Sequence, residues 1–117
     1  MDIKDYKNVY VFAEQRGGVI QPVAYELLGK ARDLADALGE KVVAMLVGYN
    51  IKSEAKNLIE MGADEVLVAD NVELFDYLTE QYSQVVYQMI TERKPGIVLY
   101  GATTIIRAFF TIYPFFN

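Results

Sequence analysis

Four short apolar runs, separated by segments with helical spacing, constrain the fold of this chain most strongly. Each run has almost no polar residue inside it, which predicts strands covered on both faces. The runs are residues 9–13, 41–47, 65–69 and 97–100. Strands that alternate with helices predict a parallel sheet joined by right-handed crossovers. We therefore expect the α/β class: a doubly wound, Rossmann-like parallel sheet with helices on both faces and strand order 3-2-1-4.

The helix between the first two strands has the clearest limits in the sequence. Pro22 suits its first turn, and Gly39 suits the left-handed turn that ends it. Apolar residues inside it recur at spacings of three and four, which predicts one buried face. They are Ala24, Leu27, Leu28, Ala31, Leu34, Ala35 and Leu38.

Two more helices are predicted further along the chain. Ser53 is placed to cap the first of them, and a short helical turn is expected over residues 72–77. The other begins at Thr79 and ends at Lys94, because Pro95 disfavours helical geometry in the residue before it. The side chains expected to point inward from the two helices are Ala55, Leu58, Ile59, Met61, Tyr82, Val85, Val86, Met89 and Ile90.

The loop after the first strand does not match either of the common phosphate-binding patterns. The Walker motif is absent, and Gly17 and Gly18 lack the third glycine and the spacing of the dinucleotide fingerprint. A flexible, hairpin-like loop explains these two glycines. Arg16 in the same loop is placed to reach a phosphate or a partner carboxylate, or is simply solvated.

The residue types that most often carry catalysis and metal binding are missing. The 117 residues include no cysteine and no histidine, which excludes thiolate nucleophiles, disulfides and the usual general base. Sixteen acidic against eleven basic residues give a net charge of −5, which argues against a nucleic-acid partner. No spaced acidic loop suggests a metal site. We therefore expect no catalytic site and no metal.

Nothing in the sequence suggests a membrane protein or a secreted one. No apolar run reaches the roughly 18 residues that a membrane helix needs. The first seven residues are mixed in charge and lack the apolar core of a secretory signal. We expect a soluble chain in the cytoplasm.

Polar residues that follow the strands are the remaining candidates for a site, since ligands collect at the carboxyl ends of parallel strands. Glu14 and Asp70 each follow a strand and could approach one another, although loop solvation explains them equally well. Thr103 and Thr104 follow the last strand. Their hydroxyls could hydrogen-bond a flavin, a nucleotide or a partner backbone, or could cap a following helix.

Three segments resemble the α subunit of electron transfer flavoproteins, in the same order as in that family. They are residues 11–31, 60–66 and 94–104. The first begins Val-Phe-Ala-Glu-Gln-Arg-Gly-Gly, the second reads Glu-Met-Gly-Ala-Asp-Glu-Val, and the third reads Lys-Pro-Gly-Ile-Val-Leu-Tyr-Gly-Ala-Thr-Thr. The resemblance implies that residues 1–105 form the N-terminal domain of such a subunit, with an adenine nucleotide alpha hydrolase-like fold.

The same resemblance implies a role in electron transfer. Its members are heterodimers of α and β subunits that contain FAD and carry electrons between dehydrogenases and an acceptor. FAD is bound mainly by a C-terminal domain of the α subunit, whereas the N-terminal domain packs on the β subunit. The resemblance thus implies a scaffold and β-subunit interface, with FAD in the full heterodimer and no cofactor on this chain alone. Thr103, Thr104 and Arg107 are the implied contacts to a flavin or to the β subunit.

The sequence departs from the family pattern after Thr104. The family continues with glycine, arginine and aspartate, but here Ile106 and Ala108 flank Arg107. We expect residues 106–117 to be a divergent apolar tail and the FAD-binding C-terminal domain to be absent. Either a reading-frame change or truncation, or a genuine short protein whose tail packs on its own sheet or on a second copy, would account for this. Self-association is expected from the tail's aromatic residues, which include Phe109, Phe110, Phe115 and Phe116.

A second function class uses the same type of fold. The alternative is a stand-alone nucleotide-binding module similar to universal stress proteins. The glycine-rich phosphate motif of that family is not visible in this chain. Unaided binding of AMP or flavin would distinguish the two functions.

Overall fold

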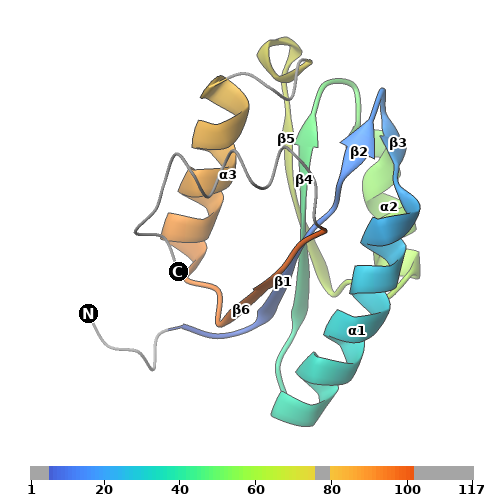
Figure 1. Ribbon diagram of the computed structural model, residues 1–117, viewed down its shortest axis with the longest axis vertical. Helices are drawn as coiled ribbons and strands as arrows, with labels where there is room; N and C mark the ends of the chain where they lie inside the picture. Colours follow the sequence, from blue (N-terminus) through green and yellow to red (C-terminus); the bar gives the residue numbers. More distant parts are fainter. Residues whose placement is uncertain (1–5, 76–79, 102–117) are drawn as a thin grey trace.

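A four-stranded parallel sheet forms the centre of the molecule. The computed structural model describes residues 6–75 and 80–101 (Figure 1). The sheet consists of β1 (Val9–Phe12), β4 (Val42–Gly48), β5 (Glu65–Asp70) and β6 (Ile97–Leu99). Its order is β5-β4-β1-β6, which are the third, second, first and fourth of the long strands expected from the sequence. The predicted α/β class is confirmed.

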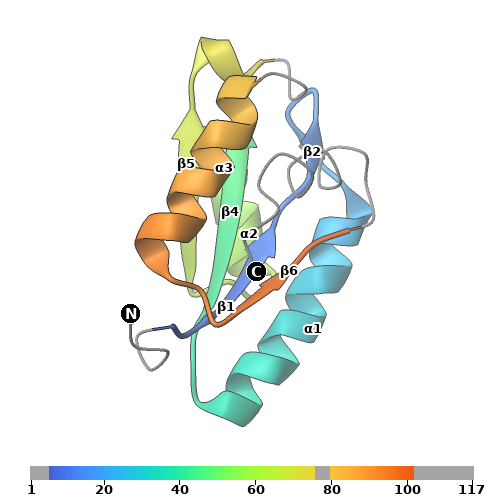
Figure 2. The same cartoon turned by 60° about the vertical axis from the view of Figure 1, so that its left-hand side comes forward.

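Helices cover both faces of this sheet. The helical segments are α1 (Pro22–Leu38), η2 (Lys52–Glu54), α2 (Ala55–Glu60), η3 (Val72–Leu74) and α3 (Glu80–Arg93). Figures 1 and 2 show α1 and α2 on one face and α3 on the other. This arrangement follows from right-handed crossovers, because the chain crosses the sheet from β1 through β4 to β5 in one direction and α3 then leads back from β5 to β6 in the other.

The two faces of the sheet carry separate apolar cores because successive side chains of a strand point to opposite faces. Val11 and Ala44 pack with α1 on one face, whereas Tyr10 and Met45 pack with α3 on the other. All residues of β1 and β4 are buried. The Tyr10 hydroxyl lies 3.4 Å from Nε of Arg93, which satisfies the one polar group of that ring.

Several apolar side chains predicted to be buried are exposed instead. Leu34 and Leu38 of α1 are exposed, as are Ile59 and Met61 at the end of α2. The buried residues of α1 are Ala24, Leu28, Ala31 and Ala35. Their spacing of four, three and four marks one narrow stripe, and the small side chains let the helix lie close to the sheet. The leucines on the flank of that stripe are therefore left at its edge. The predicted end of α1 is confirmed, since Gly39 adopts the left-handed conformation at φ 69°.

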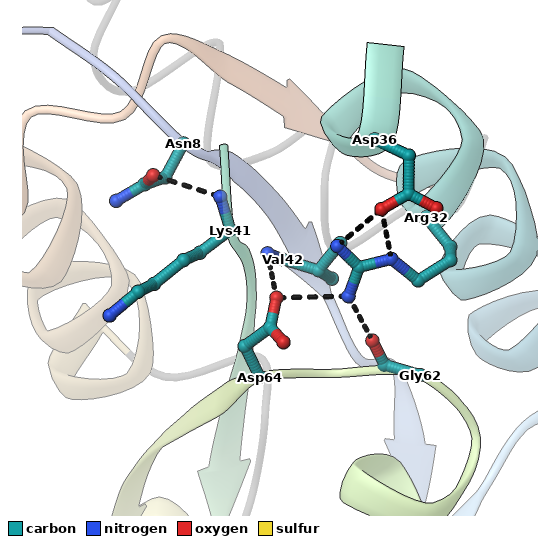
Figure 3. A network of polar contacts seen from close by, with 7 residues as sticks. All are labelled: Asn8, Arg32, Asp36, Lys41, Val42, Gly62 and Asp64. Atoms are coloured by element: carbon teal, nitrogen blue, oxygen red, sulfur yellow. Dashed lines mark hydrogen bonds and ion pairs between the residues drawn. The ribbon is translucent and has the colours of Figure 1, made fainter. Parts of the chain in front are cut away.

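A polar network ties α1 to the amino end of the sheet (Figure 3). Asp64 Oδ2 accepts hydrogen bonds from the backbone N–H of Val42 (2.8 Å) and from Nη1 of Arg32 (2.9 Å). The same Arg32 nitrogen donates to the carbonyl of Gly62 (3.0 Å), and Nη2 pairs with Asp36 (2.9 Å). Gly62 has φ 126°, a conformation that L side chains rarely adopt. The Gly-Ala-Asp part of the second segment therefore has a structural role.

Asn8 makes a second connection at this end of the sheet, just before β1. Its backbone N–H donates to a carboxylate oxygen of Glu40 (2.7 Å), and its side-chain oxygen accepts from the backbone N–H of Lys41 (3.1 Å). Asn8 has φ 76°, which asparagine tolerates better than most residues. The turn between α1 and β4 is thereby held against the start of β1.

We predict that Asp64→Asn reduces the acid sensitivity of folding. The Val42 N–H and the Arg32 guanidinium lower the pKa of Asp64 below its ordinary value of 3.8. A carboxyl group whose pKa is lower in the folded than in the unfolded state stabilises the fold at pH values above its unfolded-state pKa. That stability is lost as the pH falls through the folded-state pKa. Because the carboxylate is partly exposed, the variant should lose only about 1 kcal/mol at pH 7. Denaturant unfolding at pH 7 and below pH 3.8 measures the difference. An equal loss for both proteins on acidification would contradict the assignment.

Candidate functional site at the carboxyl edge of the sheet

The carboxyl edge of the sheet gathers a hairpin and a short helical turn around the strand ends. The hairpin consists of β2 (Gln15–Arg16) and β3 (Val19–Ile20), which pair antiparallel, and it follows β1 directly. Figures 1 and 2 show this hairpin and η3 at the same end of the sheet, beyond β4 and β5. The hairpin-like loop predicted around Gly17 and Gly18 is confirmed, with both glycines at positive φ.

Gln15 joins the hairpin to the end of β4. Its side chain is nearly inaccessible, with the residue 6% exposed. Nε2 donates to the carbonyl of Val47 (3.0 Å), and Oε1 accepts from the backbone N–H of Gly18 (2.9 Å). One buried amide thus satisfies a strand carbonyl and a hairpin N–H at once. Burial of either group without a partner would be costly.

Gly48 makes room for this amide. A Cβ built on Gly48 would lie 2.5 Å from Nε2 and 3.2 Å from Cδ of Gln15. Such a contact is closer than any real Cβ contact allows. The last residue of β4 is therefore glycine because the Gln15 amide lies directly over it, and its φ needs no glycine.

Asp70, the last residue of β5, holds the loop that follows β4. Its carboxylate accepts from the backbone N–H groups of Asn50 (2.7 Å), Ile51 (2.8 Å) and Lys52 (3.0 Å). Burial raises the pKa of Asp70, but these three donors more than offset it, so the pKa lies below its ordinary value.

The prediction that Ser53 caps α2 is wrong, because Ser53 lies within η2, and neither η2 nor α2 has a side-chain cap.

Glu14 is buried beside the hairpin and forms an ion pair with Arg16 at 3.3 Å. Glu14 and Asp70 therefore each have partners of their own, which speaks for the structural reading of the two carboxylates. Both reinforce backbone or loop geometry, and neither is arranged as half of an acid–base pair.

A pocket of about 300 Å³ lies between the hairpin and the loop after β4. Its walls include the rings of Tyr49 and Phe75, which meet edge to face with centroids 6.3 Å apart. Gln15, Gly17, Gly18 and Asn50 complete the lining. Phe75 is 74% exposed, and Val19 on the hairpin and Val72 on η3 are also exposed at this end of the sheet. We call Val19, Tyr49, Val72 and Phe75 the carboxyl-edge patch.

The site residues named from the sequence are not among those the structure describes. Thr103, Thr104 and Arg107 lie outside the described residues. The sequence analysis did not identify Gln15, Gly48 or the carboxyl-edge patch. A signal was available for Gln15, since it is a polar residue directly after a buried strand. The aromatic pair gave none, because Tyr49 and Phe75 are far apart in the chain.

The residues that the structure describes do not fit a site for FAD. Every buried side-chain nitrogen or oxygen in this part of the chain already has a hydrogen-bond partner. Gly17 and Gly18 have positive φ, so the turn of the hairpin accounts for both glycines. The described residues also contain no group of three acidic side chains that could hold a metal. No helix in the described ranges is long and apolar enough to cross a membrane.

We predict that Gly48→Ala destabilises the fold by about 1 to 3 kcal/mol, because the new methyl displaces the buried Gln15 amide. The matched control is Gly29→Ala, within α1, where a Cβ meets nothing within 4 Å. That variant should gain about 0.5 to 1 kcal/mol, since alanine favours the helix. Urea unfolding of both variants measures the contrast. A Gly48 variant as stable as the wild type would show that Gln15 can rearrange without cost.

Comparison with known proteins places this architecture in a family. The family model for the electron transfer flavoprotein domain matches residues 9–111. The chain is 54% identical to Protein FixB of Clostridium saccharobutylicum over 92% of its length and 32% of that protein. It is 48% identical to the electron transfer flavoprotein subunit alpha of Thermoanaerobacterium thermosaccharolyticum, over 90% of this chain and 32% of the relative. The acryloyl-CoA reductase electron transfer subunit beta of Anaerotignum propionicum is 41% identical over 91% of this chain and 29% of the relative.

The chain spans about a third of the length of these curated relatives. The match includes the buried strands, the hairpin and the Gly-Ala-Asp turn described above. On this evidence the chain belongs to the electron transfer flavoprotein domain family and corresponds to the N-terminal domain of the α subunit.

Proposed function

We propose that this chain is the scaffold and β-subunit interface of a heterodimeric electron carrier. FAD belongs to the assembled heterodimer and is held by parts other than the described residues. Dehydrogenases and the electron acceptor meet the chain only through that complex. The domain itself, residues 1–105, makes and breaks no bonds.

The observation that carries this proposal is the contrast between engaged polar side chains and exposed apolar side chains at the carboxyl edge. The polar side chains there are engaged with the chain itself: Gln15 with Val47 and Gly18, and Asp70 with the loop after β4. Four exposed side chains there are apolar, Val19, Tyr49, Val72 and Phe75. Two of them, Tyr49 and Phe75, line a pocket. Exposed apolar clusters around a pocket favour protein association, since interfaces are anchored by aromatic residues in desolvated pockets.

Membership of the family supports a β subunit as the partner. Relatives at 45–48% identity are named electron transfer flavoprotein subunit alpha, so each of them is one subunit of an assembly. For the same reason we propose Thr103, Thr104 and Arg107 as contacts to the β subunit or its flavin.

We predict that Phe75→Ala weakens binding of a β subunit about tenfold or more, because it removes an aromatic anchor from the interface. The β subunit that pairs with the Thermoanaerobacterium thermosaccharolyticum relative is a suitable partner, and titration calorimetry gives the dissociation constant. Stability should change by less than about 0.5 kcal/mol, since the ring is mostly exposed.

The matched control is Met61→Ala, which shortens another exposed apolar side chain, at the amino end of the sheet. It should bind the β subunit as the wild type does. Equal losses for both variants would mean that the carboxyl-edge patch is not the interface. No binding by the wild-type chain would refute the proposed function itself.

A nucleotide titration separates this function from that of a stand-alone nucleotide-binding module. We predict that the chain alone binds neither FAD nor AMP at micromolar concentration, because the described pocket offers no unengaged cation for a phosphate. Fluorescence quenching of FAD and calorimetry with AMP measure this. Stoichiometric binding of either ligand would favour the nucleotide-binding function.

A further inference from the structure

The buried amide of Gln15 lies beneath the pocket of the carboxyl-edge patch and belongs to its lining. Because the residue is 6% exposed, it offers a partner almost no surface of its own. Its two hydrogen bonds nevertheless connect the two sides of the pocket. One hydrogen bond is accepted from the backbone N–H of Gly18 in the hairpin. The other is donated to the carbonyl of Val47, two residues before Tyr49.

We propose that Gln15 is the positioning residue of the partner-binding pocket, and this inference rests on the proposed function. The amide fixes the hairpin at one distance from the end of β4, so the gap between Gly17–Gly18 and Tyr49 has a defined width. The pocket then accepts an apolar side chain of the β subunit without reorganising. Preorganisation of this kind raises affinity by removing the cost of ordering the site on binding.

Three features of the structure support a positioning role over a general contribution to the core. The hairpin strands are only two residues long, so their own pairing gives little rigidity. Gly48 leaves the space that the amide occupies, because a Cβ there would lie 2.5 Å from Nε2. Both partners of the amide are backbone groups, so it sets the backbone on each side of the pocket.

The test is a double-mutant cycle between Gln15→Met and Phe75→Ala, read as affinity for the same β subunit. Methionine keeps the length of the side chain and loses both hydrogen bonds. We expect Gln15→Met to weaken binding about tenfold, and Phe75→Ala to weaken it by a similar factor. In the double variant, the affinity for the β subunit should fall by much less than the product of the two factors. A pocket that lacks the Phe75 ring gains no affinity from a hairpin held at a fixed distance.

Gln88→Met is the matched control, because it makes the same chemical change on the exposed face of α3. It should leave the affinity unchanged. Gln15→Glu is the second variant: it keeps an acceptor for Gly18 but places a carboxylate oxygen against the Val47 carbonyl. Its loss of affinity should be at least as large as that of Gln15→Met, because the buried charge has no donor on that side. In the free chain, the Gly18 amide should exchange its hydrogen more slowly in the wild type than in Gln15→Met, because only the wild type bonds that N–H.

Each failure has its own meaning. If the wild-type chain does not bind the β subunit, the proposed function fails and this inference with it. If the wild type binds but the Gln15 variants bind equally well, only the positioning role is refuted. Affinity losses of the two single variants that simply multiply in the double variant would also refute the positioning role. They would mean that Gln15 contributes to overall stability and not to the shape of the pocket. Equal Gly18 exchange rates in the free wild type and in free Gln15→Met would refute the positioning role independently of binding.

Discussion

The parallel pairing of β1 with β4 is the constraint on which the rest of the molecule depends. Every residue of both strands is buried, so their backbone groups must pair with each other and with the flanking strands β6 and β5. Buried pairing of this kind needs an apolar layer on each face, which α1 and α3 supply. Parallel strands also cannot be joined by tight turns. The crossover helices therefore have two roles: they connect the parallel strands, and they cover the faces of the sheet.

At both ends of this sheet, side chains bind backbone groups that have no strand partner. Where the ladder stops, backbone N–H and carbonyl groups are left without strand partners. Asp64 receives the Val42 N–H at the amino end, and Gln15 receives the Gly18 N–H at the carboxyl end. At each end the side chain also fixes a neighbouring element, α1 through Arg32 and β4 through Val47. Glu14 and Asp70, two polar candidates from the sequence, likewise bind other groups of the chain.

The fold could be predicted from sequence because strands buried on both faces leave a plain signal, and so does the glycine that ends α1. Helix faces were less predictable. Leu34 and Leu38 match the helical period of the core, but the close approach of four small or branched side chains to the sheet leaves them outside it. The pocket was not predictable at all. Tyr49 and Phe75 meet only because β4 and β5 end side by side, which is a property of register and not of local pattern.

The carboxylate of Asp70 has a consequence for which ligands this edge of the sheet can admit. Three successive backbone N–H groups that point to one place form a natural receptor for an anion. Here that receptor is filled by an anion of the chain's own, tethered at the end of the adjoining strand. A free phosphate would have to compete with a group whose local concentration is set by covalent connection. The three N–H groups of this loop are thus already engaged, and a phosphate at this position would first have to displace the Asp70 carboxylate.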